Sequence, residues 1–200
     1  QIAPRLNAAG RLDDMAIGVR CLMTESPDEA FELATQLNEL NLKRRVIEAR
    51  MGAEATELMD TEALVNISEL APVVCLFRED WHEGVVGLVA SRLKDRYHRP
   101  VFAFAATEMG LLKGSGRSVN GFHLRDALAD IDTLHPGLIS RFGGHAMAAG
   151  LTLARDGLPQ FSSAMEALGK VKLRPEHLAE CILTDGELDV RDITLEVASL

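Results

Sequence analysis

Three short clusters in this 200-residue chain combine glycines with side chains that can bind an anion. The first is Lys113-Gly114-Ser115-Gly116-Arg117-Ser118, where two glycines would let backbone N–H groups approach a ligand closely. The serine hydroxyls and the guanidinium fork of Arg117 are donors suited to phosphate oxygens. A strand-ending turn with polar surface residues would show the same glycine spacing, but the flanking Lys113 and Arg117 favour a phosphate site.

The second cluster places a histidine after two glycines, within Phe142-Gly143-Gly144-His145-Ala146-Met147-Ala148-Ala149-Gly150. Gly143 and Gly144 allow positive φ and can leave a nest of backbone donors, beside which His145 would donate to a ligand or accept from it. The small residues that follow would leave a surface without bulk. A structural histidine and a tight helix–sheet contact explain the same residues, so both interpretations stay open at this point.

The third cluster, Asp80-Trp81-His82-Glu83-Gly84-Val85-Val86-Gly87, leads from a predicted strand into a predicted helix. Open α/β sheets bind ligands in loops of this kind, and a helix beginning near Gly84 would offer free N–H groups to an anion. The adjacent side chains of His82 and Glu83 point apart in an extended chain, which argues against a metal pair. Trp81 can stack on a base, but anchoring of the loop is the favoured role.

Near the N-terminus, Arg5 and Arg11 flank a stretch of small residues that includes Asn7. Both arginines could contact phosphate, and either could equally be a solvated surface charge. The sequence contains no Ser-His-Asp order, P-loop, His-Glu-x-x-His or Asp-rich metal loop. The cysteines are isolated from one another, which argues against a zinc site and a disulfide framework. We therefore expect anion-binding pieces without a complete catalytic centre.

The net charge of −9, from 21 basic and 30 acidic side chains, argues against a nucleic-acid partner when taken over the whole chain. The distribution is uneven, because residues 81–125 contain seven basic and three acidic side chains, a local net charge of +4. An anionic ligand would find a favourable field there. The longest apolar runs are far shorter than the roughly 18 to 20 residues that a membrane-spanning helix needs.

The segment Ser26-Pro27-Asp28-Glu29 predicts a helix start with a capping box. Apolar residues then recur at three- and four-residue steps to about Met59, which predicts an unusually long helix. Residues 1–24 show turn chemistry rather than a clean period. Later in the chain, the expected strands are 73–77, 101–105, 111–114, 151–153, 179–183 and 188–190, and the expected helices are 84–96, 122–131 and 158–168.

This order of elements predicts an α/β fold, with a mixed sheet flanked by helices and preceded by a long connector helix. Taken in order, four motifs resemble those of the RecJ-type single-strand-specific exonucleases of the DHH phosphoesterase superfamily. They lie at residues 4–11, 81–92, 115–118 and 143–150. The resemblance implies four parts: the end of a catalytic DHH domain at 1–24, a connecting long helix at 25–62, a DHH-associated α/β domain at 72–172, and the beginning of a truncated OB-fold domain at 176–200.

The resemblance also implies an activity for a longer parent protein. Such a parent is a metal-dependent 5′-to-3′ exonuclease of single-stranded DNA that acts in DNA repair and recombination. Two Mn²⁺ or Mg²⁺ ions on its DHH domain would activate the attacking water. The chain lacks the Asp-His-His motif, so alone it should be inactive and bind no metal. Single-stranded DNA, a single-strand-binding protein and a helicase are the implied partners, in the cytoplasm and away from membranes.

By position, the resemblance assigns substrate binding to this part of the parent. Ser115, Gly116, Arg117 and Ser118 resemble the group that holds the terminal 5′-phosphate. The partners implied across the cleft are Arg5 and Arg11, and Asn7 and His82 are further implied substrate-binding residues. Gly143, Gly144 and His145 resemble the contact to the scissile region of the strand, with His145 as the candidate for a catalytic role.

Two other classes of function remain open on the sequence. A DHH-family nanoRNase or cyclic-dinucleotide phosphodiesterase shares the Gly-Gly-His-x-x-Ala-Ala-Gly element, but it usually ends soon after the associated domain. A non-catalytic nucleic-acid-binding module would have no need for the segment at 4–11 or the long helix. A general protein-interaction scaffold leaves the basic centre of the chain unexplained.

Overall fold

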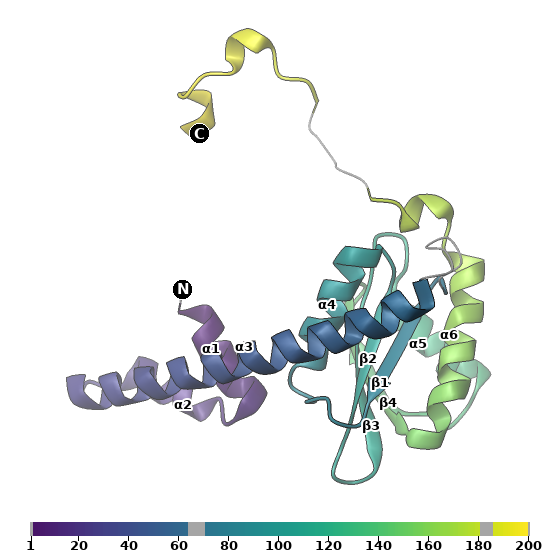
Figure 1. Cartoon of the computed structure of the whole chain (residues 1–200), viewed down its shortest axis with the longest axis horizontal. Coiled ribbons are helices and arrows are strands. Elements are labelled where there is room, and N and C mark those ends of the chain that lie inside the picture. The colour runs from purple at the N-terminus through teal and green to yellow at the C-terminus, as the bar shows by residue number, and fades with distance from the viewer. Residues whose placement is uncertain (1, 64–70, 181–185, 200) are drawn as a thin grey trace.

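The computed structural model describes residues 2–63, 71–180 and 186–199. Two short helices, α1 (Ala3–Leu12) and α2 (Ala16–Met23), pack on a long third helix, α3 (Pro27–Ala63), as Figure 1 shows. The expectation of turn chemistry over residues 1–24 is therefore wrong. Pro4 lies in the first turn of α1, where a missing N–H costs nothing, and Gly18 lies close to Leu6, so both breakers fit a packed helical pair.

The long helix begins at the expected place, but the expected capping box is wrong, because the Ser26 N–H donates to the Thr24 hydroxyl and the Glu29 carboxylate accepts from Thr24 and Arg20. The Ser26 hydroxyl accepts a hydrogen bond from the Glu29 backbone N–H at 3.4 Å, and the helix then continues for 37 residues. At about 1.5 Å per residue this is a rod of about 55 Å. Its C-terminal half packs on the α/β domain through Met51, Ala55 and Met59, all fully buried.

The α/β domain is built on a five-stranded mixed sheet in the order β1-β2-β3-β5-β4. β1 and β2 are parallel and are joined by α4, whereas the remaining neighbours are antiparallel. This confirms the predicted α/β class with a mixed sheet and a long helix. The bounds are β1 (Val74–Arg78), α4 (Val86–Tyr97), β2 (Val101–Ala106), β3 (Leu111–Arg117), α5 (Leu124–Leu134), β4 (Ile139–Gly144), β5 (Ala148–Ala154) and α6 (Leu158–Lys172).

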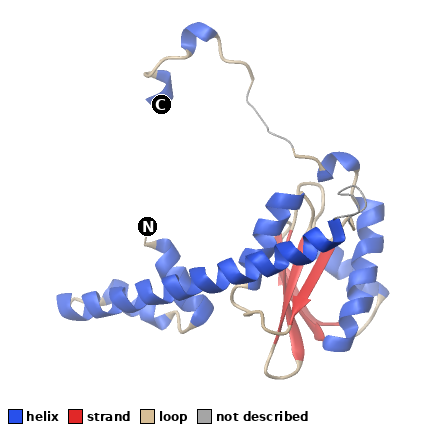
Figure 2. Cartoon of the chain, in the orientation of Figure 1, coloured by secondary structure: helices blue, strands red, loops and turns tan. Residues whose placement is uncertain are grey.

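Each face of the sheet carries its own core, and Figure 2 shows the helices on both sides. On one face, α3 and α4 cover β1 and β2, and inward residues of both strands are buried against them. On the other face, α5 and α6 cover the sheet around three phenylalanines. The Phe161 ring meets the rings of Phe102 and Phe104 edge to face, at 5.4 and 5.7 Å between centroids. Such edge-to-face pairs add to the stabilisation from burial alone.

Three differences from the predicted elements bear on the site. Residues 111–114 begin a strand that continues to Arg117, and residues 139–144 form a strand that was not expected. The expected strand at 188–190 is wrong, because these residues lie before and at the start of a 3₁₀ turn (Val190–Asp192). Most of the expected strand at 179–183 lies outside the described residues. Within the described ranges, no helix is long and apolar enough to cross a membrane.

Candidate anion-binding site

Two of the expected phosphate ligands, Ser115 and Arg117, project from β3 onto the first turn of α4. The Arg117 guanidinium donates to the Ser115 hydroxyl at 3.0 Å and to the Gly116 carbonyl oxygen at 2.8 Å. A Cβ at Gly87 would come within 2.9 Å of both side chains. Gly87 therefore lets the hydroxyl and the guanidinium lie directly against the helix.

A second arginine reaches the same place from α1. Arg11 donates to the Gly84 carbonyl oxygen at 3.1 Å, although 73 residues separate the two in sequence. A Cβ at Gly84 would lie 2.0 Å from the Arg11 carbonyl oxygen, so only glycine permits this approach. Burial, and secondarily the positive charge of Arg11, lower the pKa of Arg117 from its usual value. Arg11 and Arg117 thus approach the same end of α4, the first at the Gly84 carbonyl oxygen and the second against Gly87.

Glu83, the acidic residue next to Gly84, pairs with Lys113 at 3.4 Å rather than with this pair of arginines. In the described ranges of the chain, neither Arg11 nor Arg117 forms an ion pair with an acidic side chain. Two neighbouring cations, one of them half buried, are stabilised by an anion that accepts from both. The arrangement is chemically suited to a phosphate group.

The loop before α4 was predicted to offer free backbone N–H groups to an anion, but it instead supports Arg11 through a carbonyl oxygen. The N–H groups of Gly84, Val85 and Val86 are already used, the first by His82 Nδ1 at 3.1 Å and the others by the His82 carbonyl oxygen. The expectation of free N–H groups there is wrong. His82 instead shapes the loop whose Gly84 carbonyl holds Arg11.

Other expected ligands lie elsewhere or have structural roles. Arg5 donates to Asn38 of α3 at 3.0 Å, while Asn7 is exposed one helical turn before Arg11. Ser118 is buried, and its hydroxyl donates to the Phe122 carbonyl oxygen at 2.6 Å. The structure therefore brings Arg11, His82, Ser115 and Arg117 together but not Arg5 or Ser118.

The glycines of β3 also have a different role from the expected one. β3 pairs with strands on both sides, so this segment is not a loop around a ligand. A Cβ at Gly116 would lie 2.5 Å from the Phe102 ring, and one at Gly114 would lie 2.4 Å from the Phe104 ring. These positions are glycine because phenyl rings of β2 pack across them. A strand of alternating glycines cannot be distinguished from a phosphate loop by spacing alone.

The second glycine cluster ends β4 and begins a hairpin into β5. Gly144 has a φ of +140°, and a Cβ there would lie 2.5 Å from the Ala148 carbonyl oxygen, so the hairpin itself requires this glycine. Gly143 has no such requirement, because a Cβ there would meet nothing within 4 Å. The side chain of His145 is exposed, and its backbone N–H donates to the Ala148 carbonyl oxygen at 2.8 Å.

Beyond α4, none of the helices in the described part of the chain covers the same sheet face. Ser115, Gly150 and Gly143 are paired in one row across three strands, and the next row carries Lys113, Thr152 and Arg141. Paired residues share a face of the sheet, so these side chains point the same way as Arg117. A pocket of about 470 Å³ lies over the two rows. We call these six residues the open face.

This donor set does not fit a divalent cation. The groups around the Arg11–Arg117 pair are guanidiniums, a hydroxyl and carbonyls, whereas Mg²⁺ and Mn²⁺ prefer carboxylate-rich oxygen sets. Across the described parts of the chain, no group of three or more His, Cys, Asp or Glu side chains lies together as metal ligands would. The site therefore suits the anionic end of a substrate rather than a metal ion.

The fold is a mixed sheet with a βαβ start, covered by helices on both faces and preceded by a long helix. The chain belongs to the DHHA1 domain family, whose model matches residues 70–170.

Among curated relatives, the chain is similar to the single-stranded-DNA-specific exonuclease RecJ of Haemophilus influenzae, with 47% identity over 199 residues. The match covers 100% of this chain and 34% of the relative. RecJ of Escherichia coli is also 47% identical over 100% of the chain, and RecJ of Bacillus subtilis is 38% identical over 98% of it, covering 34% and 24% of those proteins. The chain thus spans about a third of the length of its first relatives.

A solved structure agrees with these matches. RecJ from Thermus thermophilus, in complex with Mg²⁺, has a TM-score of 0.71 and 32% sequence identity. The match covers 86% of this chain and 25% of that one. A second structure of the same enzyme, in complex with Mn²⁺, gives a TM-score of 0.70.

Proposed function

We propose that this chain is part of a metal-dependent 5′-to-3′ exonuclease of single-stranded DNA that acts in DNA repair and recombination. Within that enzyme, this part binds the DNA strand and its 5′-phosphate. One observation carries the proposal: Arg117, with Ser115, and Arg11 both lie against the start of α4, and neither arginine forms an ion pair with an acidic side chain among the described residues. The RecJ relatives, named as single-stranded-DNA-specific exonucleases, support the choice of substrate.

The geometry gives a physical source for end recognition. A terminal phosphate carries nearly two negative charges near neutral pH, whereas a phosphodiester carries one. Two adjacent guanidinium groups, each a fixed set of N–H donors, therefore favour the end of the strand over its interior. From there the strand would continue over Gly150 and Gly143 towards His145, where missing side chains permit a close approach.

The metal ions of the parent enzyme would be held outside the residues described here. The side chains at the site in this chain are mainly guanidinium groups, which repel a cation. When bound, those ions would supply the activated water that attacks the phosphodiester. The contribution of this chain is to fix the strand: Arg11, Ser115 and Arg117 hold the 5′ end, and His145 lies beside the path beyond it. The chain alone should bind DNA without cutting it.

The domain assignment follows the same proposal. Residues 1–24 would belong to the end of a DHH domain, 25–62 to the connector, 72–172 to the DHH-associated domain and 176–200 to the start of an OB-fold domain. Large apolar side chains at Met23, Phe31 and Val46, on α2 and α3, are each more than 70% exposed. Their exposure supports the proposal that the remainder of the catalytic domain covers α2 and α3.

Arg117→Ala tests the 5′-phosphate site. At low ionic strength we expect it to weaken binding of a short 5′-phosphorylated strand by about 1 to 3 kcal/mol, with little effect on a 5′-hydroxyl strand. Titration of labelled strands by fluorescence anisotropy measures both affinities. Arg125→Ala is the matched control, because Arg125 is an exposed arginine on α5, across the sheet. Equal losses on both strands would contradict end recognition.

We also propose partners and a location for the parent enzyme. A single-strand-binding protein and a helicase would supply and expose the strand that such an enzyme degrades, and the cytoplasm is where a bacterial chromosome is repaired. A nuclease that uses Mn²⁺ or Mg²⁺ is consistent with the metals named in the two Thermus structures.

A further inference from the structure

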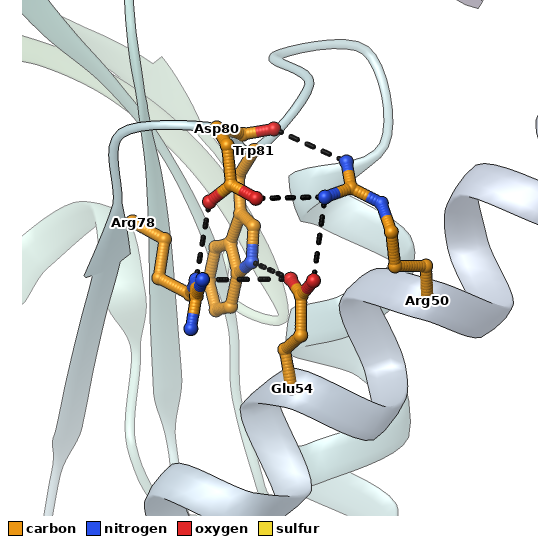
Figure 3. A network of polar contacts seen from close by, with 5 residues as sticks. All are labelled: Arg50, Glu54, Arg78, Asp80 and Trp81. Atoms are coloured by element: carbon orange, nitrogen blue, oxygen red, sulfur yellow. Dashed lines mark hydrogen bonds and ion pairs between the residues drawn. The ribbon is translucent and has the colours of Figure 1, made fainter.

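The loop between β1 and α4 is tied to the connector helix by a compact polar network, drawn in Figure 3. The Trp81 indole N–H donates to a Glu54 carboxylate oxygen at 2.9 Å, and the ring is 3% exposed. Arg50 donates to the Asp80 carboxylate at 2.7 Å and to the Asp80 carbonyl oxygen at 3.2 Å. Arg78 contacts both carboxylates, at 3.1 Å to Asp80 and 3.7 Å to Glu54.

The central group of this network is Glu54. One of its oxygens accepts from the indole, and the carboxylate lies 3.3 Å from Arg50 on the preceding turn of α3. The Glu54 side chain is 20% exposed, so its bond to Trp81 is largely shielded from water. A hydrogen bond from a buried donor to a charged acceptor is among the stronger ones in proteins. Glu54 therefore fixes where Trp81, and the loop around it, lies on α3.

The other end of the same loop reaches the phosphate site. Three residues after Trp81, the Gly84 carbonyl accepts from Arg11. The backbones of Gly84 and Arg11 touch so closely that no Cβ fits between them. The helix that follows then presents Gly87 to the side chains of Ser115 and Arg117. A displacement of the loop would therefore move Arg11 relative to Arg117.

We propose that Glu54 is a positioning residue for the 5′-phosphate site: through Trp81 it fixes the loop of residues 79–85, and the loop sets the separation of Arg11 and Arg117. This inference rests on the proposed function. Glu54 itself touches no phosphate. It acts by holding the Gly84 carbonyl and Gly87 where Arg11 and Arg117 contact them.

Glu54→Ala removes the acceptor, while Glu54→Gln keeps an oxygen that can still accept from Trp81. For wild type and both variants, the measured quantity is the ratio of dissociation constants for 5′-hydroxyl and 5′-phosphorylated strands. We expect Glu54→Ala to lower this phosphate preference by about fivefold, because a displaced loop would weaken the hold on the phosphate by about the worth of one ordinary hydrogen bond. Affinity for the 5′-hydroxyl strand should be unchanged, and Glu54→Gln should restore most of the preference. Glu39→Ala, an exposed glutamate on the same helix, is the matched control.

A second readout uses Trp81 directly, since it is the single tryptophan of the chain. Binding of a 5′-phosphorylated strand should change Trp81 emission in wild type, and a 5′-hydroxyl strand should not. Arg117→Ala should abolish the change, although Arg117 does not contact the indole. A structural role alone would leave the emission insensitive to the phosphate.

The outcomes distinguish a failure of the positioning role of Glu54 from a failure of the proposed phosphate site. If wild type prefers the phosphate and Glu54→Ala keeps the full preference, the positioning role is wrong and the proposed function stands. Equal weakening of both strands by Glu54→Ala, together with a lower melting temperature, would make Glu54 a residue for stability only and also overturn the inference. If wild type shows no preference, the proposed phosphate site fails and the inference fails with it.

Discussion

The two halves of one sheet face are built from different residues. Over β1 and β2, the inward side chains are Val74, Leu76 and Val101 with small alanines, and α3 and α4 bury them. Over β5 and β4, the same face carries Gly143, Gly150, Thr152 and the exposed Arg141, with no helix in the described ranges above it. An apolar open half would indicate a missing protein partner. Bare backbone beside an arginine instead fits the proposed DNA strand.

The glycines show the same contrast in detail. At Gly114 a side chain would collide with the molecule itself, because a Cβ would lie 2.4 Å from the Phe104 ring and 2.8 Å from Leu151. At Gly150 the only described atom within 4 Å of a Cβ would be the Gly114 carbonyl oxygen, at 3.7 Å. Glycine inside a strand costs stability and packs nothing. At Gly150 no packing within the chain requires a glycine. Its small size therefore suits a ligand that approaches the strand from solvent.

The largest expected effect comes from adding a side chain on the packed side. Gly114→Val forces the Phe104 ring out of its position, and we expect it to lower the free energy of unfolding by about 3 kcal/mol, as overpacked cores do. Urea unfolding followed by circular dichroism measures this. A variant as stable as wild type would mean that the ring moves freely and that the contrast between the two kinds of glycine is not real.

Gly150→Val should leave stability intact and weaken strand binding instead. Valine suits a strand and meets no obstacle here, so the free energy of unfolding should be unchanged or slightly higher. The two methyl groups would stand on the floor of the open face, and we expect affinity for a single strand to fall about tenfold, or about 1.4 kcal/mol. Urea unfolding and strand titration on the same preparation measure the stability and the affinity, respectively. Unimpaired binding would place the strand elsewhere.

The smallest effect concerns the polar network on the packed half. Hydrogen bonds from Arg78 and Arg50 lower the pKa of Asp80 from its usual value of 3.8. Because the folded-state pKa is depressed, the stabilisation is present above pH 3.8 and is lost as the pH falls through the lowered pKa. In an acid titration, Trp81 emission should therefore change at a pH below 3.8, before global unfolding. Asp80→Asn should lack this step, and a step that persists in the variant would assign it to another carboxyl group.

The packed half was predictable from sequence, whereas the open half was not. The apolar runs 73–77 and 101–105 are strands within a residue or so of the expected ends, because buried parallel strands are continuously apolar. β4 was missed, since its Ser-Arg-Phe-Gly-Gly stretch has neither period nor β-branched residues. Its pairing with β5, rather than its own composition, makes it a strand.

The site was predictable in composition but not in geometry. Arg11, Ser115 and Arg117 were expected to bind phosphate, and the structure brings them to one place. The meeting of Arg11 with Gly84 depends on a contact over 73 residues, which no local pattern contains. Nor could the sequence show that Trp81 bonds to Glu54, since a tryptophan that stacks on a base has the same local sequence. The anchoring role favoured for Trp81 is confirmed by its burial and its bond.

The length of α3 has a mechanical consequence. About 40 Å of helix separates Glu54 from Pro27 at 1.5 Å per residue, so a tilt of about 5° at Glu54 displaces the far end by about 3.5 Å. Conversely, a large sideways movement of whatever is attached near Pro27 becomes only a small rotation at the loop. α3 thus converts a large displacement at its N-terminal end into a small rotation at Glu54. A coarse movement of a neighbouring domain would therefore reach the loop that holds Arg11 as a much smaller displacement.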